Sequence, residues 1–207
     1  MTGVSELSRE ELAILRGLKR PERIQEFLDA DIAYNKEKHG ETCRSPRRVL
    51  RDRLGHCMEG ALLAAAALRV LGHEPLLLDL EADPDLDDDH VLALYRADGC
   101  WGAIAKSNFS GLRFRSPVYR TVRELAMSYF DQYYNLRGDK TLRAVSNPIN
   151  LRRFDPIHWM TAEADVWAIP EHLATIPHRR LVTPAQVRAL TRMDRRLYDA
   201  GMLGRAK

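Results

Sequence analysis

The chain has 207 residues, 45% of them hydrophobic and 29% charged, with a formal net charge of +3. This length suits one domain, residues 1–207, with a sizeable core, and this composition excludes disordered and fibrous classes. Because no apolar run is long enough to cross a bilayer and the first residues lack a signal-peptide pattern, we expect a cytoplasmic protein that makes no membrane contact.

The cysteines and the charged runs argue against several kinds of binding site. Cys43, Cys57 and Cys100 form no Cys-x-x-Cys pair and leave an odd thiol under any disulfide pairing, as in a reducing compartment. None of the usual zinc-ligand spacings is present, and the acidic run at residues 83–89 lacks the glycine and the closing glutamate of a calcium loop. We therefore expect neither a metal nor a cofactor.

The first 44 residues predict a helical N-terminal segment. The stretch SREELAILRGLKRPERIQEFLDADIAYN indicates one helix, a break near Lys19 to Pro21, and a second helix with Ile24 and Leu28 on its apolar face. A loop follows, and Ser45 before Pro46 is a typical helix start.

A buried helix and three strands are predicted next. The stretch CMEGALLAAAALRVLG, beginning at Cys57, predicts a helix that ends at Gly72 and is apolar on nearly all sides. PLLLDLEA, HVLALYR and CWGAIAK predict strands, with a hairpin turn at residues 97–99. This order indicates an α+β fold in which a central helix packs on a small antiparallel sheet.

The rest of the chain predicts mostly helix. Residues 121–135 have a helical pattern, an irregular arginine-rich stretch runs to about Pro177, and a last helix opens at Thr183 with Pro184 and a capping-box Gln186. Residues 137–207 thus predict a helical extension of a core at residues 45–136. The arginines of this extension are not interleaved with aromatic residues, so we interpret them as a solvated face and expect no nucleic-acid partner.

Cys57 and His90 are the candidate catalytic pair. A helix N-terminus stabilises a thiolate, and its free amide groups can receive an oxyanion. His90 opens the second predicted strand, from which its ring can be aimed at the start of the helix as a base. We interpret His56, next to the thiol, as a helix-cap or surface residue.

These residues occur in a recognisable order. Gly55-His56-Cys57 opens the helix that ends in Leu-Arg-Val-Leu-Gly, His90 begins a strand, and Asp98-Gly99-Cys100-Trp101 forms the hairpin. Over roughly residues 45–110 the chain resembles the core of the transglutaminase-like superfamily of papain-related cysteine enzymes. The resemblance implies a cysteine-protease-like fold and acyl-transfer chemistry by Cys57 with His90 as base.

The third catalytic position departs from the family pattern. The family has an Asp four residues after the hairpin tryptophan, where this chain has Ala105. Asn108 is our candidate for orienting His90, as an Asn does in papain-like sites. The alternatives are Ser107 and one of the acidic residues Asp87, Asp88 and Asp89.

The expected activity is hydrolysis or acyl transfer at an amide or ester bond. The expected substrate is a peptide, a protein or a small amide. Ser107, Trp101 and Arg113 are candidate substrate-binding residues, although Trp101 also suits core packing and Arg113 also suits solvated charge. The competing hypothesis is a catalytically inactive module that binds protein, which the absent Asp favours. The sequence does not specify an oligomeric state.

Overall fold

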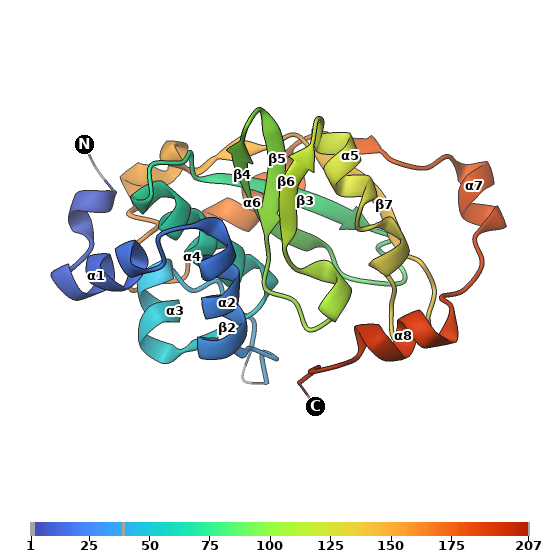
Figure 1. Ribbon diagram of the computed structural model, residues 1–207, viewed down its shortest axis with the longest axis horizontal. Coiled ribbons are helices and arrows are strands. Elements are labelled where there is room, and N and C mark those ends of the chain that lie inside the picture. The colour runs from blue at the N-terminus through green and yellow to red at the C-terminus, as the bar shows by residue number, and fades with distance from the viewer. Residues whose placement is uncertain (1–2, 39, 207) are drawn as a thin grey trace.

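The computed structural model describes residues 3–38 and 40–206 (Figure 1). The helices are α1 (Arg9–Gly17), α2 (Pro21–Asp31), α3 (Pro46–Asp52), α4 (Cys57–Val70), α5 (Val122–Met127), α6 (Ala168–Thr175), α7 (Pro184–Ala189) and α8 (Arg195–Gly201), with 3-10 turns η1 (Val4–Glu6), η2 (Ser110–Leu112), η3 (Phe130–Gln132) and η4 (Leu151–Ile157). The strands are β1 (Ala33–Tyr34), β2 (Leu54–Gly55), β3 (Leu76–Ala82), β4 (His90–Ala97), β5 (Cys100–Ile104), β6 (Arg115–Tyr119), β7 (Leu142–Ser146), β8 (Ile149–Asn150) and β9 (His178–Arg180). This mixture confirms the α+β class. Within the described ranges, no helix is both long and apolar enough to cross a bilayer.

The main sheet is antiparallel and has the strand order β6-β5-β4-β3-β7-β9, with β8 also paired to β3. The predicted hairpin joins β4 to β5, where Ala97 pairs with Cys100. Asp98 and Gly99 both have positive φ, 49° and 77°, as a two-residue hairpin turn requires. A separate parallel pair, β1 with β2, leads the chain into α4.

The two faces of the sheet carry different layers. Leu77, Val91 and Ala93 pack in the core that contains α4, whereas Leu78 and Leu92 pack in a second core that contains α5. This division follows from the two-residue period of a strand. In Figure 1, α1 to α4 gather on one side of the sheet and α5 lies on the other.

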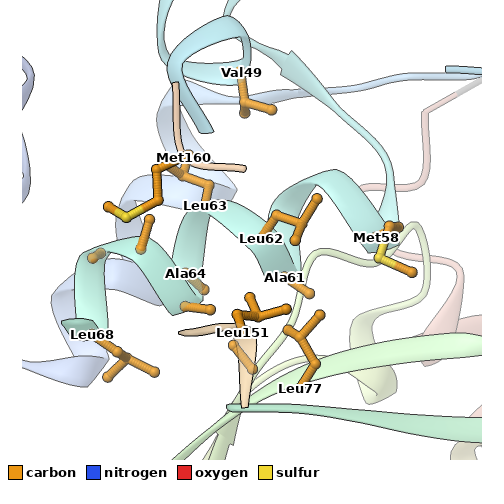
Figure 2. Packing of buried hydrophobic residues seen from close by; sticks show 14 of the residues in the cluster. Val49, Met58, Ala61, Leu62, Leu63, Ala64, Leu68, Leu77, Leu151 and Met160 are labelled. Carbon is orange, nitrogen blue, oxygen red and sulfur yellow. The ribbon is translucent and has the colours of Figure 1, made fainter. Parts of the chain in front are cut away.

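Helix α4 is the centre of the larger core. Every residue from Met58 to Leu68 is buried, and Figure 2 shows side chains around α4 meeting Val49 above and Leu77 and Leu151 below. The helix ends as predicted, with Gly72 following at φ 92°. The prediction of a buried central helix is therefore confirmed.

The C-terminal third differs from the predicted helical extension. Strands β7 and β8 both pair with β3, and β9 pairs with β7, so this segment completes the sheet. Helix α5 also ends at Met127, well before residue 135. The strands were missed because they are only two to five residues long and β7 and β9 contain arginines, which hide the apolar alternation.

Candidate functional site

Cys57 is the first residue of α4 and follows His56, which is the N-cap residue in extended conformation. The first amide groups of a helix have no acceptor within the helix, so the Cys57 N–H can serve an incoming group. The 14-residue helix also directs the positive end of its dipole at the sulfur. The predicted placement of this thiol at a helix N-terminus is confirmed.

Gly60 lets the first turn of α4 lie against the chain that follows β5. A Cβ at Gly60 would overlap the Lys106 side chain, so only glycine fits this approach. The Lys106 Nζ donates hydrogen bonds to the carbonyl oxygens of Leu28 and Ile32, at 2.6 and 2.5 Å. Lys106 therefore ties the end of α2 to the base of the site.

His90 is the first residue of β4 and is 4% exposed. Its Nε2 lies 2.9 Å from the Leu112 carbonyl oxygen in η2. Because a carbonyl only accepts, Nε2 carries a proton and Nδ1 of the neutral ring is left to accept one. The ring of Tyr133 meets the His90 ring edge-on, at a centroid distance of 6.3 Å.

The Cys57 thiol is influenced by two imidazoles. Burial raises its pKa, but hydrogen bonding to His56 and His90, together with the charges of both rings, outweighs burial and lowers this pKa to about 6. A thiol with this pKa is largely ionised at neutral pH, which is the state of a nucleophile.

His56 contacts the thiol on one side and acceptors on the other. Its Nδ1 lies 4.0 Å from the Cys57 Sγ, and its Nε2 lies 2.8 Å from the Thr42 carbonyl oxygen. The carboxylates of Glu37 and Glu59 lie 3.5 and 3.6 Å from the same Nε2. Burial lowers the pKa of His56, but its partners, the Cys57 thiolate first, raise it to about 9.

Glu59 is fully buried and satisfied by several donors. Its carboxylate accepts from the Thr42 hydroxyl at 2.8 Å, from the Arg44 backbone N–H at 2.9 Å and from the His56 backbone N–H at 3.0 Å. The Arg44 guanidinium lies 3.2 Å away. Burial raises the pKa of Glu59, but the His56 charge and these hydrogen bonds hold it below its ordinary value.

Both candidate catalytic side chains line one cavity of about 500 Å³. Acidic residues dominate the charged groups of this cavity, with Lys36 as the basic exception; the acidic residues are Glu37, Glu41, Asp87, Asp88 and Asp89. Tyr133 fixes the acidic loop, because its hydroxyl donates to the Asp88 carbonyl oxygen at 2.8 Å. Tyr34, from β1, also lines the cavity.

The group that accepts a hydrogen bond from His90 is the Leu112 carbonyl and not the predicted Asn108. The Asn108 Oδ1 accepts from the Ala206 backbone N–H at 2.7 Å, although Asn108 also lines the cavity. The Ser107 hydroxyl accepts from the Phe109 N–H, and Asp87 and Asp89 accept from Thr141 and Ala82. The Leu112 carbonyl occupies the orienting position because the 3-10 turn η2 brings the backbone to His90.

The three predicted substrate-binding residues lie in different places. Ser107 lines the cavity. Trp101 lies on β5, with the Arg96 guanidinium over its ring at 4.8 Å, and packs against the α5 side of the sheet. Arg113 forms an ion pair with Asp29 at 3.6 Å. Neither Trp101 nor Arg113 is part of the cavity lining.

Sequence reasoning missed two parts of the site. The first is the contact of His56 with the thiol. The adjacency of His56 and Cys57, with Glu59 three residues later as in a capping box, was a sequence signal that could have indicated it. The second is the Leu112 carbonyl that accepts from His90. No sequence signal indicates it, since every residue carries a carbonyl. Among the described residues no cluster of three or more His, Cys, Asp or Glu side chains suits a metal ion.

No protein-family model matches the chain, and no curated protein sequence matches it either. The resemblance to the transglutaminase-like superfamily therefore depends on the ordered motif residues alone, from Gly55 to Trp101.

Proposed function

We propose that the protein is a cysteine hydrolase or acyltransferase with a transglutaminase-like, cysteine-protease-like core. It would act in the cytoplasm on an amide or ester bond of a peptide, a protein or a small amide. The observation that carries this proposal is the shared cavity of a helix-terminal thiol of lowered pKa and a buried imidazole whose Nδ1 can accept a proton.

The reaction follows from the roles of these groups. The Cys57 thiolate attacks the carbonyl carbon, an S–C bond forms, and the oxyanion meets the Cys57 N–H at the helix terminus. His90 first takes up a proton on Nδ1 from solvent water, and it delivers this proton to the leaving amine or alcohol as the bond to that group breaks, which gives a thioester and a neutral His90. Water or an amine then attacks the thioester while His90 takes its proton, the S–C bond breaks, and the Cys57 thiolate returns.

A direct test is trapping of the acyl-enzyme with p-nitrophenyl acetate, an activated ester. We expect one burst of nitrophenolate and one acetyl group on Cys57 by peptide mass mapping, and no such label in Cys57→Ala. His90→Gln should slow acylation by roughly 10²–10⁴-fold, since a positioned general base contributes that much. Cys100→Ala is the matched control, because Cys100 is also a free, partly exposed thiol on β5.

The second candidate is a catalytically inactive module that binds protein. It is favoured by one observation, namely that a neutral carbonyl holds His90 where the family pattern has a carboxylate. Labelling of Cys100 at the same rate as Cys57, with no burst, would support this candidate and contradict the enzyme.

A further inference from the structure

We propose that His56 is a positioning residue of the site, whose permanently charged ring keeps the Cys57 sulfur ionised and so leaves His90 free to act as the proton carrier. This inference rests on the proposed function for its meaning in catalysis. It assigns the two imidazoles beside one thiol to two different tasks.

The orientation of the His56 ring is fixed from both ends. Its Nε2 must donate to the Thr42 carbonyl at 2.8 Å, so Nδ1 faces the Cys57 Sγ at 4.0 Å. The backbone N–H of the same residue donates to the buried Glu59 carboxylate at 3.0 Å. The ring therefore cannot turn away from the sulfur without losing a bond in a largely buried position.

The charges around His56 favour a positive ring. Glu37, from the loop after β1, and Glu59, from α4, both approach Nε2, and the Cys57 thiolate lies at Nδ1. Arg44 opposes them, since its guanidinium contacts Glu59 at 3.2 Å and shares that charge. Glu37 accepts from the Thr42 N–H, and the structure gives it no arginine or lysine partner within the described residues. The net environment of the ring is thus negative.

His90 stands in a different environment. Apart from the Cys57 thiol, its hydrogen-bond partner is the neutral Leu112 carbonyl, and Tyr133 meets its ring edge-on. No carboxylate stabilises a positive charge on this ring by a direct bond among the described residues. In the family pattern a carboxylate contacts the base. Here carboxylates lie next to His56 and a carbonyl contacts His90, which accounts for a site without the family's Asp.

The pH profile of Cys57 alkylation by iodoacetamide tests this assignment. In His56→Gln the midpoint should rise by roughly 1–3 pH units, because an opposite charge close to the thiolate is lost, and alkylation at pH 6 should slow about tenfold or more. In His56→Lys the midpoint should stay low, since the ammonium restores the charge. His158→Gln, which changes an exposed histidine away from the cavity, should leave the profile unchanged.

Two further measurements separate charge from folding. Glu37→Gln alters a partly exposed side chain and should raise the midpoint in the same direction by less than His56→Gln does. Nitrogen NMR of the His56 ring should show an imidazolium at neutral pH that becomes neutral at a lower pH in Cys57→Ala.

The inference and the proposed function fail separately. An unchanged midpoint in folded His56→Gln, or a neutral His56 ring at pH 7 in the parent protein, would overturn the inference even if the acyl-enzyme forms. A raised midpoint in His56→Gln without any acyl-enzyme in the parent would leave the inference standing and reject the enzyme.

Discussion

At the scale of single residues, the site depends on how two ring nitrogens and one sulfur share protons. The His90 Nε2 proton is fixed by the Leu112 carbonyl, and the His56 Nε2 proton by the Thr42 carbonyl. In each ring Nδ1 is therefore the nitrogen left for other partners, and the His56 Nδ1 lies 4.0 Å from the Cys57 Sγ. Backbone carbonyls hold both rings in place but contribute no full charge, so the carboxylates near His56 decide where positive charge gathers.

Asn108→Ala should leave the pH midpoint of Cys57 alkylation unchanged, because His90 bonds to Leu112 and not to Asn108. The same change removes the acceptor of the Ala206 N–H, so amide exchange near residue 206 should become faster. Alkylation kinetics and hydrogen exchange measure the two effects. A shifted midpoint with unchanged exchange would return Asn108 to the role of orienting His90.

The positions of Cys57 at a helix start and of His90 at a strand start were predictable, because the Gly-x-Cys before a small-residue helix and the histidine before an apolar strand are local features. The Leu112 carbonyl that accepts from His90 was not predictable, because a backbone carbonyl leaves no mark on the sequence. His56 was named as a cap, and it is the N-cap residue. Its second role depends on Glu37 and Thr42, which reach it through the loop between β1 and α3.

At the scale of elements, α4 carries the site because its first turn lies close to the chain after β5. Gly60→Ala should destabilise the protein by about 1–3 kcal/mol, since the new methyl group meets the Lys106 side chain in a packed core. The sign of this stability change is informative, because alanine within a helix is otherwise more stable than glycine by about 1 kcal/mol.

Gly17→Ala is the matched control for Gly60→Ala. A Cβ at Gly17, the last residue of α1, has nothing within 4 Å, so this change should be neutral or slightly stabilising. Urea unfolding measures both variants. A Gly60→Ala protein as stable as Gly17→Ala would contradict the close packing of α4 on Lys106.

The elements whose apolar pattern is long were the predictable ones. α4 and the β4–β5 hairpin follow from an alanine-leucine run and from an Asp-Gly turn. Strand β7 contains Arg143, whose guanidinium forms an ion pair with Asp83 at 3.2 Å. Such a strand exists because β3 and β9 offer it partners on both sides, which is information from the whole sheet.

At the scale of the whole molecule, the C-terminal third is bound into the same core as the site. Arg69, in the last turn of α4, forms a two-pronged ion pair with Asp155 of η4 at 2.6 and 2.7 Å. Both side chains are mostly buried, at 7% and 13% exposed. This pair joins η4 to the helix that carries Cys57, and the β3–β7 ladder joins β7 to the sheet.

Asp155→Ala should lower the free energy of unfolding by about 3–5 kcal/mol, because it leaves Arg69 buried without this carboxylate. Burial raises the Asp155 pKa, but Arg69 outweighs burial and holds it below the ordinary value. The pair therefore contributes stability above the unfolded-state pKa of Asp155, and this contribution is lost as the pH falls through the lower folded-state pKa.

Unfolding measured at acidic pH checks whether the Arg69–Asp155 pair loses its contribution to stability as the pH falls. The parent protein should lose more stability than Asp155→Ala does on acidification, as measured by urea unfolding at several pH values. Asp199→Ala removes an exposed pair with Arg195 and should change stability by less than about 1 kcal/mol. Parallel acid profiles for the parent and Asp155→Ala would contradict the account of this pair.

The most direct test of the account is the ionisation of Cys57 itself. Thiolate absorbance of the parent protein minus that of Cys57→Ala, followed across pH, isolates this one thiol. The account predicts a midpoint near pH 6, where both imidazoles support the thiolate. A midpoint near 9, the ordinary value for a cysteine, would show that Cys57 is an unactivated thiol and would contradict the account.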